Sequence, residues 1–160
     1  MRAVLTIGVY GWTAGAFLSA LREADVRVLL DVRQRRGVRG SEYAWANARR
    51  LQDALAEAGI EYRHLKELAP TTELRQLQYR EDERRGVGKR SRAELAPEYR
   101  ERYIREILDP VDLGTVVEGL PADGAAALFC VERDPEACHR SIVADRMAAE
   151  HGVAVTHILP

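Results

Sequence analysis

Short apolar segments alternate with longer segments of helical pattern along this chain, and this alternation constrains the fold more than any other feature. Buried parallel strands read as short, mostly apolar runs, and such runs occur at residues 3–8, 26–32, 125–131 and 153–158, with a further short strand expected at 60–64. Segments of helical pattern occupy much of the remaining sequence, at residues 13–24, 45–58, 71–85, 97–108, 111–120 and 137–151, and those at 71–85 and 97–108 are highly charged. Alternation of this kind favours a parallel sheet with helices on both faces.

We therefore predict one α/β domain over residues 1–160, folded as a Rossmann-like three-layer αβα sandwich. Its sheet should hold about five mostly parallel strands, in the order 3-2-1-4-5. The charged segment at about residues 71–108 should form a helical insertion. Ligands of such sheets bind beyond the carboxyl ends of the strands where the order reverses, which this order places between strands 1 and 4.

The chain carries no feature of a membrane or secreted protein. No apolar run approaches the roughly 20 residues of a membrane-spanning helix, and residues 1–4 do not begin a secretory signal. The two cysteines, Cys130 and Cys138, are too few for a disulfide scaffold and are expected to be free thiols. We expect a cytoplasmic protein, and the sequence leaves its oligomeric state open.

The net charge of −1 conceals two basic segments. Residues 33–40 hold four arginines and residues 84–92 hold five basic residues, and neither segment contains an acid. Glycine-rich basic loops on an otherwise acidic chain favour a polyanionic or phosphate-bearing partner, nucleic acid included, although solvated surface loops show the same pattern. The predicted anion-binding residues of these loops are Arg33, Arg35, Arg36, Arg39, Lys89 and Arg90.

The segment 130–140 carries the strongest chemical signal. A buried strand delivers Glu132 to its open end, and the first turn of the following helix then holds Cys138, His139 and Arg140. A helix start offers free backbone N–H groups and a partial positive charge, so it favours anions. Arg140 would add donors suited to phosphate, and the pKa of Cys138 should be lowered in this setting.

Four interpretations of this segment stay open. Glu132 either pairs with an arginine and ties the strand to the helix, or it acts as an acid or base beside a bound anion. Cys138 could act as a nucleophile assisted by His139, although neighbours on a helix point about 100° apart. A metal site using Cys130, Cys138 and a histidine matches no structural zinc spacing, so we predict neither a metal nor a cofactor.

Further candidates follow the first two strands. Asp31 ends the second strand on the same side as Arg33, so the two side chains can pair with each other or face a ligand together. The neighbouring loops contribute glycines and aromatics, and an aromatic beside arginines is suited to stacking on a nucleobase. The predicted catalytic residues are thus Asp31, Glu132, Cys138 and His139. The loops add Gly8, Tyr10, Gly11 and Tyr43 to the predicted binding residues.

Three motifs together resemble the DUF488 family, whose name denotes a domain of unknown function. They are TIGVYG at residues 6–11, DVR at 31–33 and CVERDPEACHR at 130–140. The sequences LKELAP and GKRS further along the chain look like one branch of that family. The resemblance extends over nearly the whole chain and implies a fold class but no activity. Many relatives carry histidine and serine after the first glycine, where this chain has Val9 and Tyr10.

The favoured hypothesis is an enzyme that acts on a nucleic acid or a nucleotide-like phosphate compound by hydrolysis. In this hypothesis Arg33, Arg140 and the helix start hold the anion. Glu132 or Asp31 then activates water or protonates a leaving group. Two other classes remain: a non-catalytic nucleic-acid-binding module, and a thiol-based enzyme or redox sensor that uses Cys138.

Overall fold

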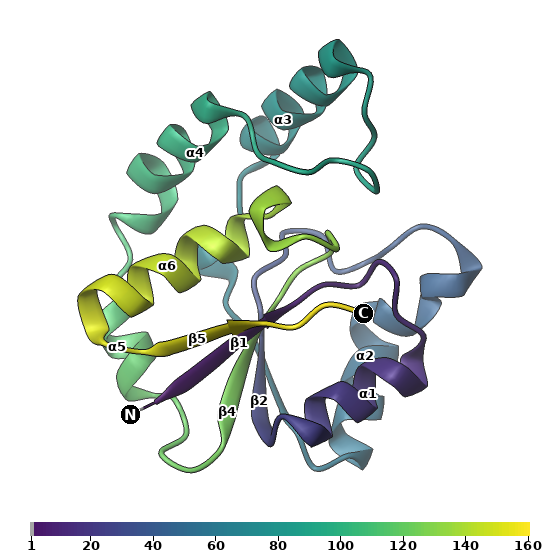
Figure 1. Ribbon diagram of the computed structural model, residues 1–160, viewed down its shortest axis with the longest axis vertical. Coiled ribbons are helices and arrows are strands. Elements are labelled where there is room, and N and C mark those ends of the chain that lie inside the picture. Colours follow the sequence, from purple (N-terminus) through teal and green to yellow (C-terminus); the bar gives the residue numbers. More distant parts are fainter. Residues whose placement is uncertain (1) are drawn as a thin grey trace.

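A sheet of five parallel strands organises the structure, which is a computed structural model describing residues 2–160 (Figure 1). The strands are β1 (Ala3–Ile7), β2 (Val26–Asp31), β3 (Glu61–His64), β4 (Ala125–Phe129) and β5 (Ala154–His157). Helices lie on both sides of this sheet, so the predicted α/β class is confirmed.

The strand order is β3-β2-β4-β1-β5, so the predicted order 3-2-1-4-5 is wrong at its centre. β4 is buried along its whole length and lies between β2 and β1. An entirely apolar strand suits this position, where neighbouring strands and both faces exclude water. β1 instead carries Thr6, whose hydroxyl lies 2.7 Å from Nδ1 of His157 on β5. This polar contact joins β1 to the edge strand.

The exchange of β1 and β4 leaves the expected binding edge in place. The chain runs from β1 through β2 to β3 at one edge, then returns through β4 to β5 at the other. Phe129, at the end of β4, pairs with Ile7 on one side and with Asp31 on the other. The carboxyl ends of β2, β4 and β1 therefore lie side by side, where ligands of open parallel sheets bind.

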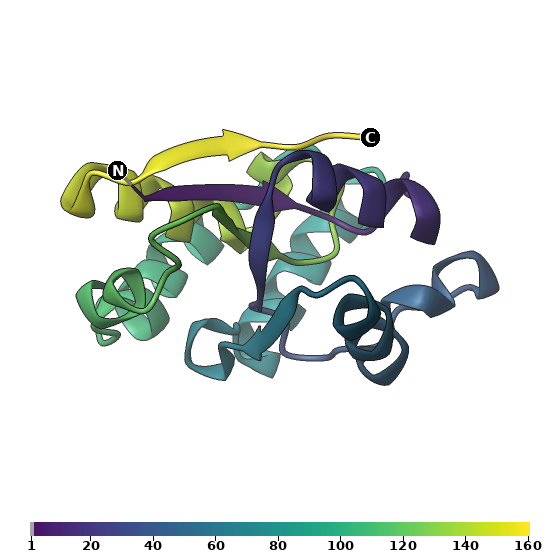
Figure 2. The same ribbon diagram turned by 90° about the horizontal axis from the view of Figure 1, so that it is seen from below.

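Helices cover the two faces of the sheet as separate layers (Figures 1 and 2). α1 (Ala14–Glu23) and α2 (Ala48–Glu57) belong to one layer, and α5 (Leu113–Glu118) and α6 (His139–His151) belong to the other. No helix among residues 2–160 is long and apolar enough to cross a membrane.

Local side-chain contacts fix where the helices begin. Thr13 caps α1 as its sequence position predicts, because its hydroxyl accepts a hydrogen bond from the Ala16 amide at 3.2 Å. The continuous helix expected at 45–58 is divided into a 3₁₀ turn and α2. Asn47 separates them with an extended backbone, and its Oδ1 accepts a hydrogen bond from the Val38 amide at 2.8 Å.

The charged segment between β3 and β4 forms α3 (Thr72–Arg85), α4 (Pro97–Tyr103) and a π-helical turn, Ile104–Leu108. Gln78 on α3 ties the two helices together. Its Nε2 donates to Asp82 at 2.8 Å, and its Oε1 accepts a hydrogen bond from the Ala96 amide at 2.9 Å. The contact with Ala96 anchors the end of the loop that leads into α4.

Candidate functional site

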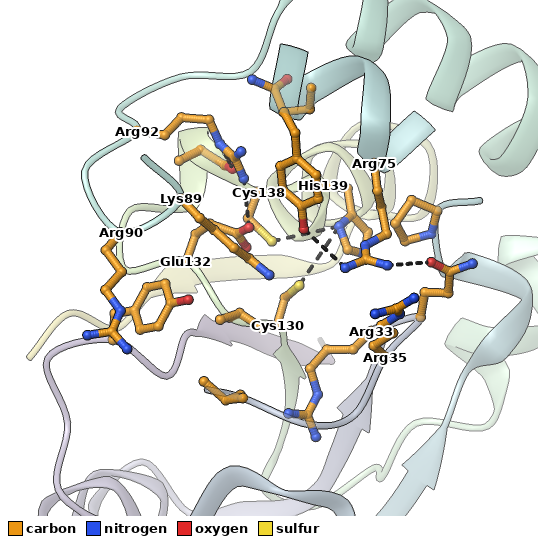
Figure 3. A pocket seen from close by; sticks show the side chains of 18 of the residues that line it. Arg33, Arg35, Arg75, Lys89, Arg90, Arg92, Cys130, Glu132, Cys138 and His139 are labelled. Carbon is orange, nitrogen blue, oxygen red and sulfur yellow. Dashed lines mark hydrogen bonds and ion pairs between the residues drawn. The ribbon is translucent and has the colours of Figure 1, made fainter. Parts of the chain in front are cut away.

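A cavity of about 710 Å³ lies beyond the carboxyl ends of the central strands (Figure 3). Its walls come from the loops after β1, β2 and β4, from α3, and from the loop between α3 and α4. The beginning of α6 closes another side. Small-molecule sites commonly measure about 300–1,000 Å³. The cavity is therefore large enough for a nucleotide-sized ligand.

The lining of this cavity is strongly cationic. Glu132 is its one carboxylate among the described residues, and its cations are Arg33, Arg35, Arg39, Arg75, Lys89, Arg90 and Arg92. Three of these cations pair with acids: Arg33 with Asp31, Arg90 with Glu42, and Arg92 with Asp82 and Glu132. The other four form no ion pair within residues 2–160, and they are Arg35, Arg39, Arg75 and Lys89.

Two thiols and an imidazole meet in the buried part of the lining, and we call Cys130, Cys138 and His139 the thiol–imidazole cluster (Figure 3). Nδ1 of His139 lies 3.9 Å from Sγ of Cys130 and 3.8 Å from Sγ of Cys138. Its Nε2 lies 2.8 Å from the carbonyl oxygen of Val32. Since a carbonyl can only accept, Nε2 carries a proton and Nδ1 faces the two sulfurs.

The backbone of Cys138 explains why it can reach the neighbouring histidine. α6 begins at His139, and Cys138 precedes it with an extended backbone, at φ −138° and ψ 145°. The expected separation of about 100° holds only for two residues that are both helical. The sequence-based objection to a Cys138–His139 contact is therefore wrong.

Burial and charge oppose each other within the thiol–imidazole cluster. Burial tends to raise the pKa of Cys138, but hydrogen bonding from Cys130 and the charges of His139 and Arg140 leave it well below the usual value. Burial raises the pKa of Cys130 well above that of an ordinary thiol. Burial tends to lower the pKa of His139, but the charge of Cys138 and the hydrogen bonds with Cys138 and the Val32 carbonyl together leave it raised. The cluster thus favours a thiolate at Cys138 beside an imidazolium.

Glu132 follows β4 and faces the same cavity. Its Oε1 accepts a hydrogen bond from Arg92 at 2.7 Å, and Arg92 also pairs with Asp82 at 2.6 Å. Its Oε2 is buried and has no hydrogen-bond partner in the described part of the chain. Burial and then the charge of Cys138 raise the pKa of Glu132, against the lowering effect of Lys89 and Arg92. A carboxyl group in this state is suited to proton transfer.

Asp31 is engaged away from the cavity, although its neighbour Arg33 lines it. Oδ1 of Asp31 accepts from Nε of Arg33 at 2.9 Å, and Oδ2 accepts from Nη2 at 2.8 Å. The Tyr62 hydroxyl donates to Oδ2 at 2.6 Å. Nη1 of Arg33 donates to the Ala46 carbonyl at 2.9 Å. The carboxylate of this buried pair is saturated with hydrogen bonds, and the pair ties β2 to the following segments.

Arg140 and Gly8 hold the backbone that carries Glu132. Arg140 is fully buried, and it donates to the carbonyls of Glu132 at 2.7 Å and Arg133 at 3.1 Å. A Cβ atom at Gly8 would lie 2.0 Å from the Glu132 carbonyl oxygen, so the close approach of the two backbones requires glycine. Neither residue lines the cavity. Both act by positioning the end of β4.

Two tyrosines and an arginine join the loops around the cavity mouth. The Arg90 guanidinium lies 5.2 Å from the ring centres of both Tyr10 and Tyr43, which are themselves 5.3 Å apart. The Tyr43 hydroxyl accepts from the Gly11 amide at 3.1 Å. Arg90 also pairs with Glu42 at 3.2 Å. These contacts connect the loop after α3 with the loops after β1 and β2.

The structure brings together most of the residues selected from the sequence. Those that line the cavity are Glu132, Cys138, His139, Tyr10, Arg33, Arg35, Arg39, Lys89 and Arg90. Those outside its lining are Asp31, Gly8, Gly11, Arg36, Tyr43 and Arg140. Sequence reasoning missed Arg75 and Arg92 and left Cys130 out of the predicted site. Arg92 belongs to a basic segment that had been recognised, whereas Arg75 lies in a charged helix with no local signal.

The fold and this cavity define an α/β protein with its candidate site at the carboxyl edge of a parallel sheet. The model of the family described as "Domain of unknown function DUF488" matches residues 13–147, and the chain belongs to this family. The family resemblance found in the sequence motifs is therefore confirmed.

Other comparisons add little to the family assignment. A search of curated proteins found no match. Among solved structures, the chain is similar to the conserved hypothetical protein APE0931 from Aeropyrum pernix K1, with 21% identity and a TM-score of 0.40. The alignment covers 99% of this chain and 38% of that one. The chain therefore spans well under half of the length of that protein.

Proposed function

We propose that this protein is an enzyme that hydrolyses a small phosphate-bearing substrate, such as a nucleotide, held in the cavity at the carboxyl ends of β1, β2 and β4. The observation that carries the proposal is the charge of the lining, where seven cationic side chains accompany one carboxylate. A concave surface with this balance concentrates anions, because its low-dielectric walls focus the field of the fixed charges.

The cations without acidic partners are the expected contacts of the phosphate. Arg35, Arg39, Arg75 and Lys89 line the cavity and form no ion pair within residues 2–160. Lys89 lies mostly out of solvent; burial tends to lower its pKa, but the charge of Glu132 and the smaller contributions of Tyr79, Cys130 and Tyr10 together leave it raised. A charged ammonium group in this position would bind phosphate with little competition from water.

Glu132 is the proposed acid–base group. Hydrolysis requires a side chain that takes a proton from the attacking water and returns a proton to the leaving oxygen. Oε1 of Glu132 is held by Arg92, which fixes the carboxylate, while Oε2 has no partner among the described residues. We assign the proton transfer to this free oxygen.

A second candidate is a thiol-dependent enzyme acting on the same class of anion. The contact of 3.8 Å between Sγ of Cys138 and Nδ1 of His139 favours it. In that mechanism the Cys138 sulfur attacks the substrate, Glu132 protonates the leaving group, and water then releases the product from sulfur. Substitution of Cys138 by serine would abolish this activity, together with any covalent intermediate seen by mass spectrometry.

A ligand screen followed by a turnover assay tests the proposal. Inorganic phosphate, pyrophosphate and nucleoside mono-, di- and triphosphates are ranked by the thermal shift that each produces, and the best ligands are tested for hydrolysis. We expect Glu132→Gln to remove turnover and Glu136→Gln, an exposed acid of the same loop, to retain it. Full turnover in Glu132→Gln would contradict the assignment. Salt-dependent nucleic-acid binding with no turnover of any ligand would support the binding module instead.

A further inference from the structure

The thiol–imidazole cluster places two sulfurs against one ring nitrogen. Nδ1 of His139 faces them because the Nε2 proton is directed at the Val32 carbonyl, and it can make one hydrogen bond, through a lone pair in the neutral ring or through a proton in the imidazolium. Both sulfurs approach that one nitrogen, at 3.9 Å and 3.8 Å. Nδ1 therefore cannot make a good hydrogen bond with both sulfurs, and sulfur is a weak hydrogen-bonding partner in any case. One cation between the three atoms would engage all of them.

The separations between these atoms fit the edges of a zinc tetrahedron. Zinc lies about 2.3 Å from thiolate sulfur and about 2.0–2.1 Å from imidazole nitrogen. Tetrahedral angles then separate sulfur from nitrogen by about 3.6 Å and the two sulfurs by about 3.8 Å. The observed sulfur–nitrogen distances of 3.9 Å and 3.8 Å exceed this by a few tenths of an ångström. All three donor atoms lie within 4.8 Å of one another.

The surroundings of His139 also resemble those of a metal ligand. A ligating histidine commonly donates its other ring N–H to a backbone carbonyl or a carboxylate, which fixes the tautomer and the ring orientation. Nε2 of His139 makes this contact with the Val32 carbonyl at 2.8 Å. The His139 ring is buried and packs against Tyr103, with 5.3 Å between ring centres. Nδ1 is thereby held toward the sulfurs without any movement of the backbone.

We propose that Cys130, Cys138 and His139 bind a zinc ion whose fourth coordination position opens into the cationic cavity. All three ligands contribute to the cavity lining, which gives the ion an entry path and leaves room for a water or a substrate oxygen. Two thiolates balance the charge of a divalent cation, so burial of the complex is tolerated. Three protein ligands and one open position characterise catalytic zinc, whereas the spacing rules applied to the sequence describe closed structural sites.

The role of the ion, though not its binding, rests on the proposed hydrolytic function. A zinc ion at this position would supply a water molecule whose pKa is near about 7. The water oxygen would form the new bond to phosphorus as the bond to the leaving oxygen breaks. Its proton would pass to Oε2 of Glu132 and then to the leaving oxygen, so no other reactant is needed.

Metal analysis of the intact chain provides the first test. The protein is loaded with zinc, freed of excess metal by dialysis, and analysed by elemental mass spectrometry. We expect about one zinc ion per chain, and at least about a hundredfold weaker affinity in Cys138→Ser and His139→Gln. His151→Gln, which alters an exposed histidine at the end of α6, should bind as the unaltered protein does. Equal affinity in all of these proteins would overturn the proposal.

Cobalt substitution tests the same site without any altered residue. Cobalt(II) in the unaltered protein should give tetrahedral visible bands and an intense sulfur-to-cobalt charge-transfer band, both removed by added zinc. Absence of the charge-transfer band would exclude thiolate ligation. Zinc should also slow alkylation of both cysteines, and a chelator should restore it. Rapid alkylation of Cys138 that is insensitive to zinc and chelator would contradict the proposal and support the thiol-dependent enzyme.

The two proposals fail in different ways. Stoichiometric zinc bound through the three ligands, with no affinity for phosphate compounds, would refute the proposed function and leave the metal site standing. Binding and hydrolysis of a phosphate compound by protein shown to be metal-free, and unaffected by chelator, would refute the metal site and leave the proposed function standing.

Discussion

Two buried acid–arginine pairs stand at the ends of neighbouring strands, and they differ in how completely they are satisfied. At the end of β2, both oxygens of Asp31 are occupied by Arg33 and Tyr62. Beyond the end of β4, Glu132 is bound by Arg92 through one oxygen only, and the other has no partner within residues 2–160. Asp31 lies outside the cavity lining, whereas Glu132 is part of it.

The difference between the pairs separates a structural ion pair from a group available for chemistry. A buried carboxylate with every lone pair bonded gains nothing from a ligand and loses stability when it is altered. A buried carboxylate with a free oxygen has a raised pKa and an unused acceptor. The same sequence signal, an acid at or just beyond the end of a buried strand, therefore leads to two roles. The partners Tyr62 and Arg92, which are distant in sequence from these acids, contribute to the difference.

The largest expected effect is a loss of protein stability when the Asp31–Arg33 pair at the end of β2 is broken. Asp31→Asn leaves the buried Arg33 guanidinium without its counter-charge and should lower the free energy of unfolding by roughly 3–5 kcal/mol. Urea unfolding followed by circular dichroism measures this loss. Asp53→Asn, an exposed acid of α2, is the matched control and should change stability by less than about 0.5 kcal/mol. A loss under about 1 kcal/mol for Asp31→Asn would remove the distinction between the two pairs.

The second largest effect on stability is expected at Gly8, where the backbone approaches the Glu132 carbonyl closely. Gly8→Ala places a methyl group against the Glu132 carbonyl oxygen, so it should cost about 1–3 kcal/mol and displace the segment that carries Glu132. Thermal unfolding and ligand affinity should both reveal the change. Gly15→Ala, whose Cβ meets nothing within 4 Å, should be neutral or slightly stabilising. If the two variants were equally stable, the proposed positioning role of Gly8 would be wrong.

The third effect concerns ligand affinity and leaves the fold intact. Lys89→Ala removes a cation with no ion-pair partner among the described residues, and it should weaken phosphate binding about tenfold, or about 1.4 kcal/mol. Isothermal titration calorimetry at two salt concentrations would also show a shallower salt dependence. Arg49→Ala, an exposed cation of α2, should bind normally. Unchanged affinity in Lys89→Ala would place the ligand elsewhere.

The smallest expected effect is on protein stability when the Glu132–Arg92 pair beyond the end of β4 is altered. Glu132→Gln should alter the free energy of unfolding by less than about 1 kcal/mol, because burial already disfavours its charge and Arg92 keeps Asp82 as a partner. The same urea measurement used for Asp31→Asn checks this value. A loss as large as that of Asp31→Asn would show that both pairs are structural.

The three central strands β1, β2 and β4 could be predicted because each is a mostly apolar, buried run, but the order of the strands could not. Ala125–Phe129 has no polar residue to mark its neighbours, and the pairing of β1 with the edge strand β5, including the contact between Thr6 and His157, is a tertiary feature without a local sequence signal. The division of the helix expected at 45–58 was also hidden, since it depends on a contact between Asn47 and the distant Val38 amide.

The candidate site was predicted as far as polar residues at strand ends could indicate it. Glu132, Cys138 and His139 follow from the edge of the sheet, whereas Arg75 and Arg92 enter from α3 and the loop after it. Their approach depends on how the insertion folds back, which no local pattern encodes. The contact of Cys138 with His139 was disfavoured because Cys138 was taken to be helical, and a site shared with Cys130 was set aside because its spacing matches no structural zinc pattern.

Mapping a bound anion onto the backbone amides tests the central claim most directly. The claim is that the cavity beside β4, and not the saturated pair of β2, is the functional site. In a titration of isotope-labelled protein with pyrophosphate, amide resonances of residues 88–92 and 131–139 should shift together, while those of Asp31 and Tyr62 stay in place. Shifts confined to β2 and β3, or spread over the exposed arginines of α2, would contradict the account.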